Sequence, residues 1–153
     1  MYDPAMATAT LTDFLRTPKA VIAKTDDGAV RITRRDAADL VVLRADDLEQ
    51  QQEGIELASR LMRAVLTSGG DIKAAVRAAF AWTALLSDAE RDEFARDMDQ
   101  HLWSATELGH YERLLMVFHE WRETAEAYAA GMPRGTGEGL TWFSKPVDVP
   151  RPS

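Results

Sequence analysis

Four basic side chains near the start of the chain have the positions expected of phosphate ligands. Arg16 and Lys19 flank a Thr-Pro dipeptide that separates two predicted helices. Arg34 and Arg35 end a short strand-like run. Arginine and lysine beside helix ends commonly hold phosphate oxygens, so these residues are candidates for contacts with nucleic acid. They are equally consistent with ordinary surface charges paired with nearby aspartates, and both interpretations remain open.

Aromatic side chains in the second half of the chain are candidates for binding a protein partner. Trp121 and Tyr128 are seven residues apart and share one face of a predicted helix, where they either dock a partner or pack the bundle; we favour packing. Three more apolar residues follow in a Gly/Pro-rich segment, where we favour insertion into a partner groove over packing on the chain's own helices. These residues are Leu140, Trp142 and Phe143.

Neither a metal site nor a catalytic set is expected. His101, His110 and His119 are nine residues apart, so neighbours on one helix would face opposite sides. A Glu-x-x-His pair at Glu107 and His110 lacks the second copy that a di-iron site needs. The chain has no cysteine, no Gly-rich phosphate loop and no nucleophile elbow. We therefore expect a protein that is not an enzyme and that uses no cofactor.

Composition points to a small intracellular protein with an uneven charge distribution. The chain has 153 residues and a net charge of −7, and no apolar run approaches the ~20 residues of a membrane span. We expect a cytoplasmic protein with no membrane contact. Residues 1–48 carry seven basic and eight acidic side chains, a net charge of −1, whereas residues 49–153 carry the remaining −6. The acidity therefore does not exclude a nucleic-acid contact in the first segment.

Residues 1–50 have the mixed pattern of a small α/β unit. An apolar helical stripe over 11–22 is broken at Thr17-Pro18, with Thr17 as the expected cap of the second helix. A turn at 26–28 precedes strands near 30–33 and 40–44, and a short strand is possible at 7–10.

The rest of the chain is predicted to be helical up to residue 130. A long helix runs from 45 to 68, with Gly54 as an expected hinge between the two halves of the protein. A helix over 72–83 follows, and two capping boxes, at Ser87–Glu90 and Ser104–Glu107, are expected to begin two more helices. The predicted class is α+β, divided into residues 1–50, a helical region 51–130, and a Gly/Pro-rich tail 131–153.

Three stretches of the first segment resemble the prevent-host-death (Phd/YefM-like) antitoxins. They are residues 11–19 (LTDFLRTPK), 30–35 (VRITRR) and 39–49 (DLVVLRADDLE), and residues 120–129 (EWRETAEAYA) are similar to a run near the end of longer members. The resemblance implies a small dimeric DNA-binding unit followed by a region that binds a toxin. It also implies that Arg16 and Lys19 meet DNA backbone or base edges, and that Arg34 and Arg35 mainly contact phosphates.

The sequence therefore predicts the antitoxin of a type II toxin–antitoxin system. Such a protein neutralises its cognate toxin by direct binding and represses its own operon through operator DNA. Two alternatives remain open: a stand-alone DNA-binding transcriptional regulator, and an orphan helical interaction module that does not bind DNA.

Overall fold

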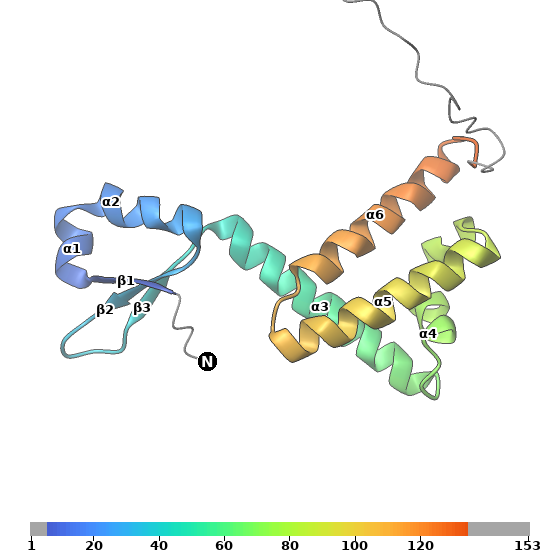
Figure 1. Ribbon diagram of the computed structural model, residues 1–153, viewed down its shortest axis with the longest axis horizontal. Coiled ribbons are helices and arrows are strands. Elements are labelled where there is room, and N and C mark those ends of the chain that lie inside the picture. The colour runs from blue at the N-terminus through green and yellow to red at the C-terminus, as the bar shows by residue number, and fades with distance from the viewer. Residues whose placement is uncertain (1–5, 135–153) are drawn as a thin grey trace, which may run out of the picture.

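A computed structural model describes residues 6–134 and has two parts that share one long helix (Figure 1). A three-stranded sheet and two short helices form the N-terminal unit, and the helices that follow form a bundle. The predicted α+β class is confirmed. The shared helix, α3 (Ala45–Thr67), crosses position 50 without interruption, so the expected boundary at that residue falls inside a helix.

The sheet of the N-terminal unit is mixed and has the strand order β1-β2-β3. β1 (Ala7–Thr10) pairs in parallel with β2 (Val30–Thr33), and β2 pairs in antiparallel fashion with β3 (Leu40–Val42). Parallel neighbours need a crossover, because a tight turn cannot join them. Here α1 (Leu11–Arg16), α2 (Pro18–Ala23) and the 3-10 helix η1 (Lys24–Asp27) make that crossover.

The predicted break between two helices at Thr17-Pro18 is confirmed. Pro18 is the first residue of α2, where its missing N–H costs nothing. Thr17 is the N-cap residue of α2, as expected, but its side chain makes no capping hydrogen bond. Its hydroxyl instead donates to the Asp13 carbonyl of α1, 3.0 Å away. α1 itself begins with a capping box, in which the Asp13 N–H donates to the Thr10 hydroxyl at 3.1 Å.

The N-terminal unit and the bundle have separate hydrophobic cores. The smaller core consists of the buried residues Ala9, Val21, Val30 and Ile32. The bundle comprises α3, α4 (Ile72–Ala79), the 3-10 helix η2 (Ala81–Leu85), α5 (Asp88–Leu108) and α6 (Glu112–Ala129). In the described part of the chain, no helix combines the length and the apolar character that crossing a membrane requires.

Gly54 is not a hinge, because α3 is continuous through it. The residue is buried where α3 meets the start of α6, and a Cβ atom added there would overlap the Cβ of Tyr111. Glycine is therefore used at this position for close helix packing. A lone glycine in a helical pattern has the same sequence signature in either role.

The second predicted capping box is also wrong. Ser104 and Thr106 lie inside α5, where their hydroxyls donate to the carbonyls of Gln100 and Leu102, at 3.2 and 3.0 Å. The buried face of the helix continues through this region to Ala105, so packing overrides the local cap signal. α5 ends instead at Gly109, which adopts a left-handed conformation with φ 69°. The first box is confirmed: the Ser87 N–H donates to Glu90 Oε2 at 2.7 Å.

The three histidines do not share a helix, so the expected geometry for them is wrong. His101 lies on α5, His110 lies in the connection after it, and His119 lies on α6. Within residues 6–134, no group of three or more histidine, aspartate or glutamate side chains is placed to hold a metal ion.

Candidate nucleic-acid interface and partner-binding region

The candidate DNA-binding residues lie at one end of the N-terminal unit. Arg16 is the last residue of α1, and Lys19 is in the first turn of α2. Arg34 and Arg35 follow β2 directly and begin the connection to β3. α1 and this connection both lie at the end of the unit away from the bundle (Figure 1). The structure thus brings the two predicted pairs to the same end of the molecule.

Arg34 is held by the connection that follows it. Its Nε donates to the Ala38 carbonyl at 2.7 Å, and its backbone N–H donates to Asp39 Oδ1 at 3.3 Å. Asp39 also forms an ion pair of 3.2 Å with Arg31 on β2. These contacts fold the connection back on the strand and restrict the guanidinium of Arg34. Within residues 6–134, its two Nη groups make no hydrogen bond, so they remain able to donate to a ligand.

Arg16, Lys19 and Arg35 are exposed, and none of these side chains forms a hydrogen bond or an ion pair with the described residues. Lys19 and Arg35 are therefore not paired with an aspartate in this part of the chain, whereas Arg16 interacts electrostatically with Asp13. Hydrogen bonds from Thr10 lower the pKa of Asp13, and the charges of Lys24 and Arg16 lower it further.

Trp121 and Tyr128 are half-buried on α6 and pack against the bundle core. The indole of Trp121 donates to Asp97 Oδ2 at 2.8 Å, and the Tyr128 hydroxyl donates to Glu90 Oε1 at 2.6 Å. The favoured packing interpretation is confirmed for both rings. Toxin binding by these residues stays a prediction. The other three residues predicted to contact the toxin, Leu140, Trp142 and Phe143, lie outside the described residues.

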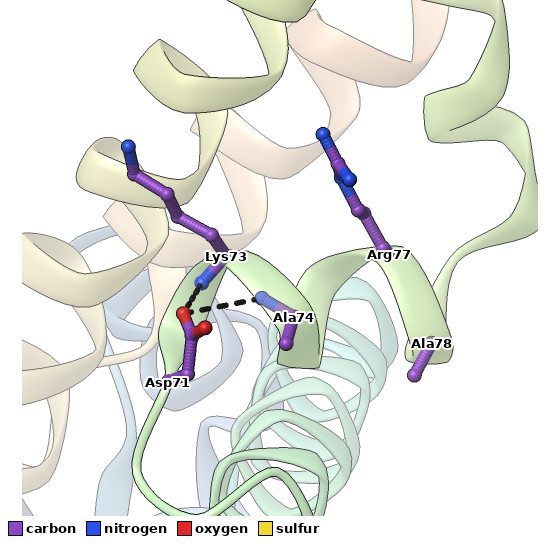
Figure 2. A pocket seen from close by; sticks show the side chains of 5 residues that line it. All are labelled: Asp71, Lys73, Ala74, Arg77 and Ala78. Carbon is purple, nitrogen blue, oxygen red and sulfur yellow. Dashed lines mark hydrogen bonds between the residues drawn. The ribbon is translucent and has the colours of Figure 1, made fainter.

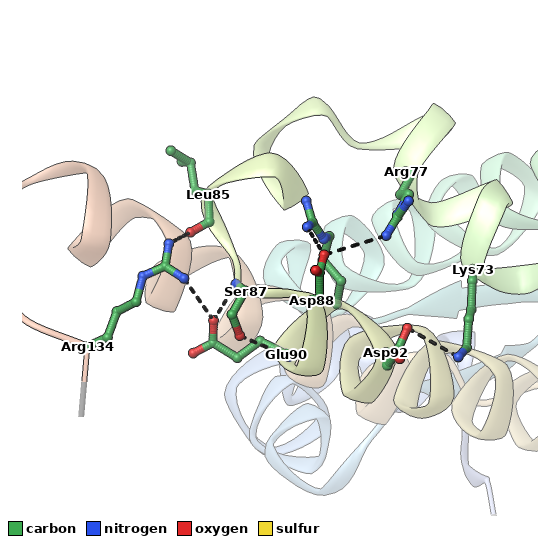
Figure 3. Close-up of polar contacts among 9 residues, drawn as sticks. Lys73, Arg77, Leu85, Ser87, Asp88, Glu90, Asp92 and Arg134 are labelled. Atoms are coloured by element: carbon green, nitrogen blue, oxygen red, sulfur yellow. Dashed lines mark hydrogen bonds and ion pairs between the residues drawn. The ribbon is translucent and has the colours of Figure 1, made fainter. Parts of the chain in front are cut away.

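Glu90 joins the start of α5 to the chain that follows α6 (Figure 3). The Arg134 guanidinium donates to the Leu85 carbonyl at 2.5 Å, lies 3.8 Å from Glu90 Oε2, and stacks on the Tyr128 ring. Burial raises the pKa of Glu90, but hydrogen bonds from Tyr128 and Ser87 outweigh this effect and leave the pKa below its usual value. The same bond to Glu90 raises the pKa of Tyr128. Arg134 therefore fixes the beginning of the Gly/Pro-rich segment.

An acidic hollow lies between α5 and α6, beside Trp121. Its volume is about 440 Å³, and its lining residues are Glu90, Glu93, Asp97, Glu120, Trp121 and Thr124. Four carboxylates and one aromatic face suit a cationic side chain, because an aromatic ring and negative charge both attract cations. Sequence reasoning identified Trp121 but not the hollow, whose carboxylates come from two helices.

A second hollow, of about 540 Å³, lies on α4 and includes two basic side chains (Figure 2). The N-terminal amides of α4 are already bonded, since Lys73 N and Ala74 N donate to Asp71 Oδ1. Lys73 forms an ion pair with Asp92 at 3.2 Å, and Arg77 lies 3.9 Å from Asp88 (Figure 3). The positive charges of Lys73 and Arg77 are therefore neutralised by aspartates of α5, so this hollow is poorly suited to binding an anion.

Sequence reasoning missed the division of α3 into two apolar faces. The pattern placed Leu48, Ile55, Met62 and Leu66 on one helix together with Leu57 and Leu61, without separating them. The structure buries Leu57 and Leu61 in the bundle and exposes the other four. Trp103 on α5, whose exposed fraction is 65%, was also missed. Spacing alone contains part of this signal, since 48, 55 and 62 differ by seven residues.

Comparison of the chain with protein-family models, curated proteins and solved structures found no match. The structure itself defines the class: an α+β protein in which a small mixed-sheet unit is joined through one helix to a helical bundle.

Proposed function

We propose that this chain is an antitoxin of a type II toxin–antitoxin system that also represses its own operon as a DNA-binding dimer. The observation that carries the proposal is the group of basic residues at the far end of the N-terminal unit, three of which form no hydrogen bond or ion pair with the described residues. A two-fold dimer doubles such a group into a surface that fits the two halves of a palindromic operator.

The bundle supports the second half of the proposal. Residues 49–153 carry a net charge of −6, and the hollow beside Trp121 is lined with carboxylates. A toxin that cleaves or modifies nucleic acid needs positive charge at its site, so an acidic surface is complementary to it. From α1 to α3 the chain forms helices, two strands and a long helix, which is the order that the resemblance to the antitoxins implies.

DNA binding is tested by replacing Arg34 and Arg35 with alanine. We expect binding to the DNA upstream of the protein's own gene to weaken at least about tenfold. The logarithm of the association constant for DNA falls linearly with the logarithm of the salt concentration. The magnitude of this slope should decrease by about 0.9 for each phosphate that the variant no longer neutralises. The measurement is a gel shift or anisotropy titration at several salt concentrations. Arg35→Ala alone is informative, because the Arg35 side chain forms no hydrogen bond or ion pair within the described residues.

The matched control for this test removes the same charge from the bundle. Arg63→Ala combined with Arg113→Ala changes two exposed arginines on α3 and α6 and should leave binding unchanged. An Arg34/Arg35 variant with unaltered affinity and salt slope would remove the support for a DNA interface here and favour the orphan interaction module.

Toxin binding is tested by co-expression with the product of the adjoining gene in the same operon. We expect a stable complex to co-purify and growth to be restored in cells that express both proteins. Reversing two exposed charges of the acidic hollow, with Glu93→Lys and Glu120→Lys, should abolish both results, because a basic partner would then meet positive charge.

The control reverses an exposed carboxylate elsewhere, with Glu56→Lys on α3, and should behave like the unaltered chain. Full rescue by the Glu93/Glu120 variant would show that the toxin binds at another surface. A wild-type chain that captures no partner and restores no growth would overturn the antitoxin proposal. DNA binding that persisted in that case would favour a stand-alone regulator.

A further inference from the structure

One flank of α3 carries a row of exposed apolar side chains. Leu48, Ile55 and Met62 have exposed fractions of 42, 43 and 48%, and Leu66 reaches 80%. Their spacing is seven, seven and four residues, which places all four within about 40° of one another around the helix axis. We call these four residues the α3 stripe. Side chains in such a row normally pack against another element.

The α3 stripe is distinct from the face of α3 that packs in the bundle. That face buries Gly54, Leu57, Ala58, Leu61 and Ala64. Between Leu48 and Leu66, the other residues on the flank of the stripe are uncharged: Gln51, Gln52 and Ser59. Within the same stretch, the charged residues lie on the solvent side of the helix and on the opposite flank: Glu49, Glu53, Glu56, Arg60 and Arg63. The helix thus has one neutral flank and one charged flank.

We propose that the α3 stripe is the surface along which two copies of this chain associate, with their α3 helices parallel. The inference rests on the proposed function, in which the chain acts as a dimer. It specifies which surface forms the dimer interface and how the two α3 helices are oriented. A basic partner of a chain with net charge −7 would bind where the carboxylates are. A neutral row with a seven-residue repeat is instead complementary to a copy of itself.

The location of the N-terminal units selects the parallel arrangement. In a parallel pair each residue of the stripe meets its own copy, so Leu66 packs on Leu66. An antiparallel pair would place the two N-terminal units, and with them the basic residues, at opposite ends of the paired helices. The parallel pair also places both N-terminal units at the same end.

Apolar exposure continues from the stripe into the sheet of the N-terminal unit. Leu40 and Val41 on the edge strand β3 have exposed fractions of 45 and 49%, and α3 begins three residues after that strand. Two adjacent copies would bring these edges near each other and double the basic group at the far end. The parallel pair would therefore cover exposed apolar residues of α3 and of β3.

The test measures the association constant by sedimentation equilibrium. Ile55→Glu or Met62→Glu should weaken the dimer at least about 30-fold, because each change buries a pair of like charges at the centre of the contact. Met116→Glu is the matched control: it changes a residue of similar exposure, 43%, on α6, and should leave the dimer intact. Circular dichroism confirms that each variant is folded.

The outcomes separate this inference from the proposed function. A dimer that survives Ile55→Glu and Met62→Glu overturns the α3 stripe as the interface and leaves the DNA-binding proposal standing. A wild-type chain that is monomeric at all concentrations overturns both the stripe and the dimeric operator complex.

Orientation is tested with single cysteines, which have no background because the chain contains none. Leu48→Cys, Ile55→Cys and Met62→Cys should each give a disulfide-linked dimer with diamide as the oxidant, because a parallel pair brings matching Cα atoms within the ~7 Å that a disulfide spans. If Leu48→Cys fails to link to itself but links to Met62→Cys or Leu66→Cys, the pair is antiparallel and the proposed arrangement is wrong.

Discussion

Replacement of Phe94 by alanine is expected to lower the free energy of unfolding of the bundle by about 3–5 kcal/mol. Phe94 is fully buried on α5, and four other aromatic rings surround it. Its ring centroid lies 5.0 Å from that of Trp82 and 6.0 Å from that of Trp121, with Phe80 and Phe118 at 6.3 and 6.4 Å. Alanine would leave a cavity that these large, mutually packed rings cannot fill.

The measurement is chemical denaturation followed by tryptophan fluorescence, which reports on Trp82 and Trp121 beside the site. Phe94→Leu, which keeps most of the volume, should cost less than about 1.5 kcal/mol. Trp103→Ala on the same helix removes a larger but exposed ring and should change stability by no more than about 0.5 kcal/mol. Equal losses from Phe94→Ala and Trp103→Ala would contradict the packing described for this cluster.

Gly54→Ala is expected to destabilise the protein by about 2 kcal/mol, although alanine is the better helix former. A glycine-to-alanine change inside a helix normally gains about 1 kcal/mol. Here the new methyl group would overlap the Cβ of Tyr111, which is fixed to the backbone and cannot rotate away. Overpacking of this kind costs about 1–3 kcal/mol or more, so the steric term outweighs the propensity. Thermal unfolding of the Gly54→Ala variant and the unaltered chain shows directly whether the substitution raises or lowers the stability.

A double-mutant cycle isolates the contact between Gly54 and residue 111. In a Tyr111→Gly background the overlapping atom is gone, so Gly54→Ala should become neutral or stabilising. Gln50→Ala, at an exposed position of the same helix, controls for propensity and should have little effect. A higher melting temperature for Gly54→Ala than for the unaltered chain would show that α3 and α6 do not approach closely at this point.

Local signals in the sequence were sufficient for the N-terminal unit. Proline at position 18 cannot continue the preceding helix, because it lacks an N–H, but it suits the first position of the next one. The alternation of Val30 and Ile32 with polar neighbours is typical of a half-buried strand. The first capping box, at Ser87, was equally informative, because the two side chains bond each other's backbone within one turn. These features depend on neighbours in the chain and needed no knowledge of the tertiary structure.

The features that the sequence did not reveal depend on residues far apart in the chain. Ser104 has the pattern of a cap, but the buried face through Leu102 and Ala105 keeps α5 continuous. Gly54 has the pattern of a hinge, and only the approach of Tyr111 gives it a packing role. The acidic hollow combines carboxylates of α5 and α6, and helical periodicity within either segment does not indicate which faces meet.

α3 runs without a break from the N-terminal unit into the bundle. The number of residues in this helix therefore determines how far the N-terminal unit is rotated about the helix axis relative to the bundle. Each residue of a helix advances the chain by about 1.5 Å and turns it by about 100°. One residue inserted between Leu48 and Gly54 would therefore rotate the basic end about a third of a turn relative to the acidic hollow, whereas seven inserted residues would nearly restore its direction. The length of this segment thus determines the angle, measured around the axis of α3, between the basic residues of the N-terminal unit and the acidic hollow of the bundle.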